Sequence, residues 1–158
     1  MKEQAEKALK EMLDISTDIH RAMFYSGDQV LASNFPESLH PAMLAKAGEL
    51  AALGAERAAD MGASPLTQLV IESGGGTVFL VREAQDAGMA VLATCKKDSR
   101  IGLVFYDMKT CIRDAQEEPE AEVVADASTA AGFEAPSGGG GSADGGGSAD
   151  VGEGEVAG

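Results

Sequence analysis

The sequence predicts an α+β fold in which helices cover both faces of an antiparallel β-sheet. Residues 66–95 contain three apolar runs of strand length separated by turn residues, which is the pattern of an antiparallel meander. Two of these runs are apolar at both alternating sets of positions, so both faces of those strands have to be covered. Residues 2–15, 39–61 and 101–115 have the apolar spacing of helices and can provide that cover.

The N-terminal segment supplies one helix and one hairpin. Lys2–Ile15 carries apolar residues at spacings of three and four with charges on the opposite side, which predicts an amphipathic helix. Ile19–Tyr25 and Gln29–Ser33 are apolar enough to be strands, and Ser26–Asp28 between them is a turn sequence. We therefore expect a two-stranded hairpin before the long helix.

The long helix is predicted over Leu39–Met61, and turn residues mark both of its ends. Ser38 is expected to cap the first turn through its hydroxyl group, and Pro41 is tolerated within that turn. Gly62 is expected to end the helix in a left-handed conformation.

The apolar face of this helix is poor in bulky side chains. Gly48 and Gly54 lie inside the helix, where each glycine costs about 1 kcal/mol relative to Ala. Either they are merely tolerated, or they allow another backbone, from the sheet or from a second copy of the helix, to approach closely. In the second case, replacing Gly54 by Leu should strain the contact by about 1 to 3 kcal/mol and abolish a dimer. The apolar stripe consists of Met43, Ala47, Leu50, Gly54, Ala58 and Met61.

The three strands of the meander differ in the polarity of their faces. They are expected at Leu66–Glu72, Thr77–Arg82 and Met89–Cys95. The second and third are apolar on both faces, whereas Gln68 and Glu72 make one face of the first strand polar. Such a strand is typical of a sheet edge, and an open edge needs either protection or a partner.

After the meander, the chain is predicted to form one more helix and then a tail. Lys96–Arg100 is a polar loop, and Ile101–Ala115 has helical apolar spacing. The remaining sequence is acidic and rich in Gly, Ala and Ser, so it cannot bury enough apolar surface to offset chain entropy. We expect one folded domain over residues 1–115 and a disordered acidic tail over residues 116–158, with a short helix near 121–130 as an alternative.

The charge excludes some classes of partner. The net charge is −14, all 12 basic residues lie within residues 1–115, and the rest of the chain holds only acidic charges. This balance argues against binding to nucleic acid or to an anionic membrane surface. The two cysteines form no disulfide framework, and the N-terminal residues are charged where a signal peptide is apolar, so we expect a cytoplasmic protein.

The sequence contains no arrangement that predicts catalysis, a metal site or a cofactor. Gly74–Gly76 is followed by a strand and not by Lys, so it is interpreted as a hairpin turn and not as a phosphate-binding loop. His20 and His40 have no clustered ligands in the sequence. Cys95 precedes two lysines, which leaves open a nucleophile with a lowered pKa as an alternative.

The basic residues Lys96, Lys97 and Arg100 form a cluster in the loop before the last helix. The simplest interpretation is a solvated loop. The alternatives are a docking site for an acidic partner surface, or for the acidic tail of the protein itself.

The order of predicted elements resembles the Roadblock/LC7 family. Ala22–Ala32 is similar to the first hairpin of that family, and Leu44–Met61 is similar to its alanine-rich long helix. Met89–Ala93, followed by a polar loop and Arg100–Val104, resembles its last strand and the start of its final helix. The resemblance covers residues 3–115.

The resemblance implies five antiparallel strands in the order 2-1-5-4-3, with the long helix on one face and the first and last helices on the other. It also implies pairing through the long helix and the third strand, either with a second copy of the chain or with a paralogue. These are the two elements that the residue pattern leaves without partners. The expected interface residues are Ala47, Leu50, Ala51, Gly54, Ala58, Leu69 and Ile71.

The function that the resemblance implies is non-catalytic. Family members commonly regulate or scaffold small Ras-like GTPases, and some prokaryotic members stimulate hydrolysis in a partner resembling the gliding-motility GTPase. A regulator would hold the switch segments of the GTPase in a hydrolysing geometry, and Arg100 is the candidate to test for an inserted arginine finger. The alternatives are a purely structural dimerisation adaptor, as in dynein light chains, and an enzyme with Cys95 as nucleophile.

Overall fold

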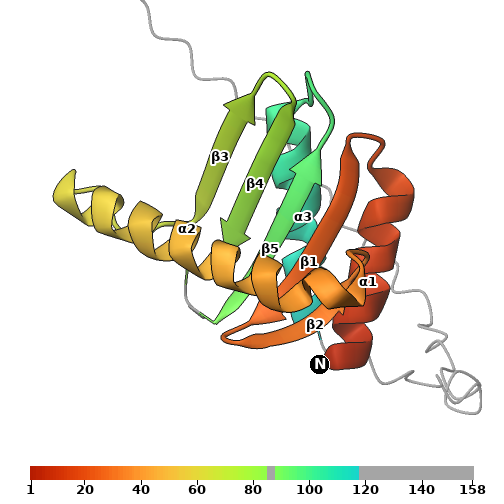
Figure 1. Ribbon diagram of the computed structural model, residues 1–158. Coiled ribbons are helices and arrows are strands. Elements are labelled where there is room, and N and C mark those ends of the chain that lie inside the picture. Colours follow the sequence, from red (N-terminus) through yellow and green to blue (C-terminus); the bar gives the residue numbers. More distant parts are fainter. Residues whose placement is uncertain (85–87, 118–158) are drawn as a thin grey trace, which may run out of the picture. The chain divides into compact units, whose positions relative to one another are not determined.

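The computed structural model describes residues 1–84 and 88–117, and its elements follow the predicted order (Figure 1). The expectations of a disordered tail and of a short helix near 121–130 lie outside the described residues, apart from residues 116 and 117 at the end of the last helix. The elements are α1 (Lys2–Ile15), β1 (Ile19–Ser26), β2 (Gln29–Ser33), the 3₁₀ turn η1 (Glu37–Leu39), α2 (His40–Asp60), β3 (Gln68–Ser73), β4 (Gly76–Arg82), β5 (Met89–Cys95) and α3 (Ile101–Gln116).

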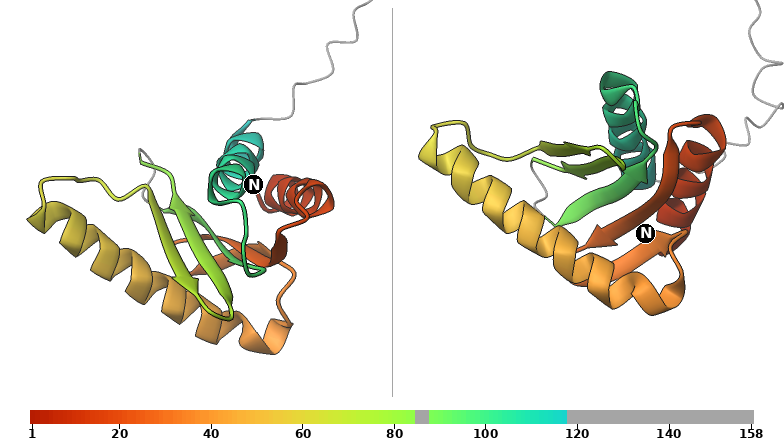
Figure 2. Two further views of the ribbon diagram at one scale, coloured as in Figure 1. Left: turned by 90° about the horizontal axis from the view of Figure 1, so that it is seen from above. Right: turned by 45° about the horizontal axis from the view of Figure 1, so that its top comes forward.

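The five strands form one antiparallel sheet in the order β2-β1-β5-β4-β3, as predicted. Helix α2 crosses one face of the sheet, and α1 and α3 lie side by side on the other (Figure 2). In this order, β1 and β5, the first and last strands in the sequence, pair with each other inside the sheet, and β2 and β3 form its two edges.

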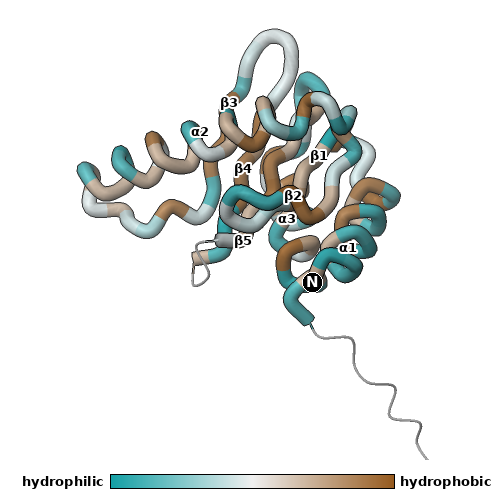
Figure 3. Tube along the Cα trace, turned by 60° about the horizontal axis from the view of Figure 1, so that its bottom comes forward, coloured by the Kyte–Doolittle hydropathy of each residue, from teal (hydrophilic) through white to brown (hydrophobic). Residues whose placement is uncertain are grey.

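The prediction that the central strands are buried on both faces is confirmed. Phe79 lies in the core under α1 and α3, where its ring meets that of Phe105 edge to face at 5.0 Å between centroids. Leu80, the next residue of β4, lies in a second core that packs under α2 around Ala47. Hydrophobic residues accordingly concentrate along the strands, whereas hydrophobic and hydrophilic residues alternate along α1 (Figure 3).

The boundaries of α2 and β3 correct two details. Ser38 does not cap α2, because it lies inside the 3₁₀ turn that leads directly into the helix, and no side chain caps the first turn. Strand β3 begins at Gln68 and not at Leu66, because Leu66 is still directed against α2 on the way back to the sheet. Gly62 does have the predicted left-handed conformation, with φ of 69°.

Candidate interaction site at the sheet edges

Strand β3 forms a regular edge of the sheet. Gln68–Ser73 pairs with β4 residue by residue without a register shift. Among residues 1–84 and 88–117, no strand pairs with its outer side. This edge is the one that the polar residues of β3 predicted.

The hydrogen-bond pattern shows which residues of β3 turn their backbone outward. The N–H of Arg82 donates to the carbonyl of Thr67 at 2.8 Å, so these two residues form a hydrogen-bonded pair. Ser73 and Gly76 close a two-residue turn and belong to the same alternating set. Gln68, Val70 and Glu72 belong to the other set, so their N–H and C=O groups point away from β4, toward the open edge.

The side chains of β3 divide between the two faces of the sheet. Val70 is half-buried against the core under α1 and α3. Leu69 is half-buried on the α2 face, and Ile71 on that face is 43% exposed. The predicted interface residues Leu69 and Ile71 therefore lie where a neighbouring subunit could cover them.

Helix α2 extends beyond this edge. Its C-terminal part runs past β3 in every ribbon view (Figures 1 and 2). Met61, which the sequence pattern placed on the buried stripe, is 82% exposed because the helix has left the sheet by that point. Of the predicted interface residues on α2, Ala47 is fully buried within the chain, and the other four are half-buried: Leu50, Ala51, Gly54 and Ala58.

The two glycines of α2 have different surroundings. A Cβ atom on Gly54 would lie 2.8 Å from Cδ2 of Leu66, so the small residue makes room for a side chain of its own chain. A Cβ atom on Gly48 would meet nothing within 4 Å. Substitution of Gly54 by Leu would therefore disturb the contact with Leu66 before it tested a dimer, and Gly48 is the more open of the two positions.

The opposite edge, β2, is short and irregular. The pairing of Gln29–Ser33 with β1 shifts at a β-bulge opposite the Phe24–Tyr25 step. Beyond the end of β2, Asn34 continues the pairing with its side chain: Oδ1 accepts a hydrogen bond from the N–H of Ala22 at 2.7 Å, and Nδ2 donates to the carbonyl of His20 at 3.1 Å. Bulges and short strands make an edge a poor template for another strand.

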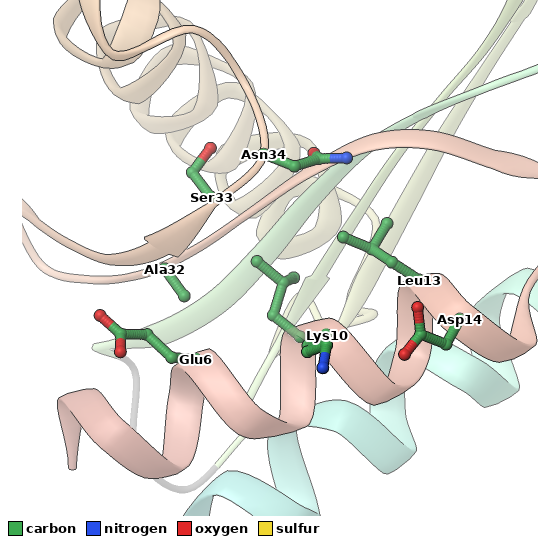
Figure 4. A pocket seen from close by; sticks show the side chains of 8 residues that line it. Glu6, Lys10, Leu13, Asp14, Ala32, Ser33 and Asn34 are labelled. Atoms are coloured by element: carbon green, nitrogen blue, oxygen red, sulfur yellow. The ribbon is translucent and has the colours of Figure 1, made fainter.

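Helix α1 runs beside β2 and leaves an open groove of about 420 Å³ between them (Figure 4). Leu13 and Ala32 contribute apolar surface to it, and Glu6, Lys10 and Asp14 project from α1 along its rim (Figure 4). The charges alternate in sign along the rim, with two carboxylates and one ammonium group.

A buried aspartate that the sequence reasoning missed occupies the basic cluster. The side chain of Asp18 is 2% exposed, and its Oδ1 lies 2.9 Å from Nζ of Lys96. Its Oδ2 accepts hydrogen bonds from the backbone N–H of Arg100 at 2.9 Å and from Nε of Arg100 at 3.2 Å. These hydrogen bonds, that of the Arg100 backbone first, hold the pKa of Asp18 well below its usual range.

The predicted docking cluster is therefore partly structural. Lys96 and Arg100 neutralise Asp18 and join the start of β1 to the start of α3. Arg100 also approaches the hydroxyl of Thr17 at 3.4 Å, although its side chain remains 63% exposed. Lys97 is exposed and makes no ion pair within the part of the chain that the structure describes.

The buried environment of Cys95 does not support the alternative of a reactive thiol. Burial, together with the smaller effect of the negative charge of Asp18, raises the pKa of the Cys95 thiol to about 12, although a hydrogen bond with Ser99 acts in the opposite direction. The alternative in which the neighbouring lysines lower the pKa of Cys95 is not supported, because the ammonium group of Lys96 is directed toward Asp18. Burial likewise raises the pKa of Cys111 to about 12. Neither thiol is an activated nucleophile.

No metal-binding group of three or more His, Cys, Asp or Glu side chains occurs within residues 1–84 and 88–117. Nε2 of His40 lies 3.1 Å from the carbonyl oxygen of Phe35, and His20 is exposed. In the same residues, no helix combines the length and the apolar character that crossing a bilayer requires.

Comparison with solved structures identifies the fold. The structure is similar to a Roadblock/LC7 domain from Streptomyces avermitilis, with a TM-score of 0.61 at 15% identity over 68% of this chain and 91% of that chain. It is also similar to Myxococcus xanthus MglB, with a TM-score of 0.55 at 13% identity over 72% of this chain and 85% of that chain. An MglB with a tetrameric arrangement gives a TM-score of 0.51 at 17% identity over 72% of this chain and 84% of that chain. No protein-family model and no curated protein matches the sequence.

Proposed function

We propose, with the Roadblock/LC7 fold as the premise, that the protein is a non-catalytic homodimer that regulates a small Ras-like GTPase. The observation that carries the dimer is the open and regular β3 edge beneath an overhanging α2. The GTPase partner is supported by the family resemblance, which is an association between fold and function. The two free thiols suit a protein of the cytoplasm, where such GTPases act.

The arrangement of Arg100 favours one mode of regulation over another. An arginine finger has to reach into the nucleotide site of the partner. Arg100 is instead tied to Asp18 and Thr17, and its backbone N–H is bound by the same carboxylate. We infer that the dimer acts by holding the GTPase's own switch segments, with the exposed Lys97 as a contact to an acidic partner surface.

The test uses small Ras-like GTPases from the same organism, loaded with GTP and mixed with the full chain. The expected result is a changed rate of single-turnover hydrolysis or of nucleotide release, reduced by Lys97→Glu and retained by the charge-preserving Lys97→Arg. A set of GTPases that shows neither effect would contradict regulation.

The alternative is a structural dimerisation adaptor without an effect on hydrolysis. It is favoured by the engagement of Lys96 and Arg100 in the ion pair with Asp18, which leaves little of the basic cluster for a partner. A dimer that binds a GTPase in a sedimentation experiment but changes neither hydrolysis nor nucleotide release would support the adaptor.

A further inference from the structure

Three residues form a row across the α2 face of the sheet at one of its ends. Tyr25 of β1 lies opposite Ala90 of β5, and Ala90 lies opposite Arg82 of β4. Residues directly opposite each other in neighbouring strands project from the same face of a sheet, and Tyr25 and Ala90 both belong to the core on the α2 side. The Cα atoms of Tyr25 and Arg82 are two strand spacings apart, about 10 Å. Because the residue between them is alanine, the two larger side chains flank an unfilled space.

Helix α2 covers this row with small residues. Gly48, Ala52 and Ala55 lie on one flank of the helix and line the space above the row. A Cβ atom on Gly48 would meet nothing within 4 Å, so α2 leaves the space open from its side as well. The result is a pocket of about 380 Å³ between α2 and the sheet, a volume typical of small-molecule sites. Among the described residues that line it, Tyr25 and Arg82 have the only large side chains.

The hydroxyl group of Tyr25 is a polar group at this pocket that lacks a hydrogen-bond partner. Tyr25 is only 6% exposed, and it forms no hydrogen bond with any residue within 1–84 and 88–117. Burial raises the pKa of its hydroxyl group, while the positive charge of Arg82 acts in the opposite direction, so the guanidinium group lies on the side of the hydroxyl. A buried hydroxyl group without a partner is destabilising, so its position at a pocket indicates that a bound molecule completes it.

We propose that this pocket binds a small organic anion, with the carboxylate or phosphate group held between Tyr25 and Arg82 and an apolar body packed against α2. The guanidinium group of Arg82 presents five N–H donors in a planar fork, so it can bind two oxygens of an anion in addition to its other contacts. The hydroxyl group of Tyr25 donates one more hydrogen bond to the same anion. All residues of the site come from one chain, so the inference is independent of the proposed homodimer and of a GTPase.

The charge and the shape of the surroundings fit this class of ligand. Among the described residues that line the pocket, Arg82 alone carries a charge, so the pocket selects anions although the whole chain is acidic. A second hollow of about 240 Å³ shares Ala55 and Arg82 with the pocket and extends along α2 to Pro65 and Leu66. These apolar residues give the body of the ligand a surface to pack on.

The first experiment titrates the full chain with four probes and follows the backbone amide signals by NMR. Benzoate and phenyl phosphate carry both an aromatic body and an anionic group, whereas inorganic phosphate lacks the body and benzamide lacks the charge. A concentration of about 10 mM nearly saturates a site with a Kd of about 1 mM. Benzoate or phenyl phosphate should shift the signals of Gly48, Ala52 and Ala90, and the tighter of the two identifies the anionic group. Inorganic phosphate and benzamide should bind at least about tenfold more weakly.

A second experiment removes only the hydroxyl group, in Tyr25→Phe. Because that group has no partner in the described part of the chain, the variant should be at least as stable as the unmodified protein in a urea titration. The Kd for the tighter anion should rise by about 10- to 100-fold, since a hydrogen bond to a charged group is lost. Tyr106→Phe is the matched control, because Tyr106 is 64% exposed on α3, and neither quantity should change.

A third variant, Gly48→Leu, fills the pocket from α2. Leucine is favoured over glycine inside a helix, and the new side chain enters open space, so the variant should keep or gain stability while it loses binding. Ala45→Leu adds a side chain of the same kind at an exposed position of the same helix and should leave the Kd unchanged.

The outcomes separate this site from the proposed function. Benzamide that binds as tightly as benzoate, an unchanged Kd in Tyr25→Phe or Gly48→Leu, or the absence of amide shifts at about 10 mM would each overturn the anion site. A chain that sediments as a monomer, or that affects no GTPase, would overturn the proposed function and leave the anion site standing.

Discussion

The two edges of the sheet, β2 and β3, are built differently. Strand β2 carries a β-bulge, runs beside α1 and is extended by the side chain of Asn34. Strand β3 pairs regularly along Gln68–Ser73 and leaves Ile71 exposed. Bulges, short length and neighbouring helices are the usual ways in which an exposed edge is protected from pairing with another chain.

The difference between β2 and β3 is more informative about their roles than the structure of either edge by itself. A protein that left both edges open would show only that protection is absent. Here the same sheet is protected at one edge and left regular at the other, which supports the proposed pairing at the regular edge. The difference lies in particular residues, so it can be tested at each edge separately.

The largest effect is expected from proline at the centre of the open edge. In Val70→Pro, the lost N–H is the one that points outward, so the chain itself should stay folded. In the proposed homodimer, each copy loses the hydrogen bond of this N–H, worth about 0.5 to 1.5 kcal/mol, and its proline ring obstructs the partner strand, so the dimer should weaken by at least about 100-fold in sedimentation experiments.

The matched control is Val30→Pro on β2. Ser26 and Gln29 close a two-residue turn as a hydrogen-bonded pair, so the N–H of Val30 also points away from its neighbour strand, and Val30 is half-buried like Val70. Its dimer constant should match that of the unmodified protein. Equal weakening in the two variants would show that the edges do not differ in use.

The next largest effect is expected from Asp18, which forms ion pairs with Lys96 and Arg100. Asp18→Asn leaves Lys96 and Arg100 without their carboxylate and should lower the free energy of unfolding at neutral pH. The folded pKa of Asp18 lies below its ordinary value of 3.8, so its stabilisation is complete above about pH 4 and is lost as the pH falls toward the lowered pKa. The unfolding free energies of the two proteins, measured by urea titration, should therefore converge in acid.

Asp14→Asn provides the control for this pH dependence. It removes the same charge from an exposed position four residues earlier. Its stability should follow that of the unmodified protein at each pH, and a similar convergence in this variant would remove the special role of Asp18.

The smallest effect is expected at the end of β2. Asn34→Ala removes two hydrogen bonds to β1 and should cost about 1 to 3 kcal/mol of unfolding free energy. Asn34→Asp keeps the acceptor for the N–H of Ala22 and should recover part of that loss. The dimer constant should not change in either variant, because β2 lies at the far side of the sheet from β3.

Local pattern predicted much of this fold. The alternation of Phe79 and Leu80 with their neighbours predicted a strand buried on both faces, and Gln68 and Glu72 predicted an edge. The strand order came from the resemblance to a family. The order depends on pairings between distant segments, which spacing within one segment does not reveal.

The features that the sequence pattern did not predict are contacts between residues far apart in the sequence. Asp18 and Arg100 are 82 positions apart, and nothing near Asp18 in the sequence marks it as buried. The sequence left open whether Gly54 is merely tolerated or allows another backbone to approach, and it did not reveal the neighbouring side chain of Leu66, which lies beyond the end of the helix. The bulge in β2 and the outward direction of Val70 depend on strand register, so they required the structure.

The central position of β5 has a consequence for how the chain is made. Strand β5 lies between β1 and β4, although it is the last of the five strands to be synthesised. A nascent chain that has not yet reached Met89 therefore holds two separate hairpins, each with a long apolar strand that lacks its neighbour. Until translation passes Cys95, the ribosome-bound chain presents more unpaired strands than the finished protein does.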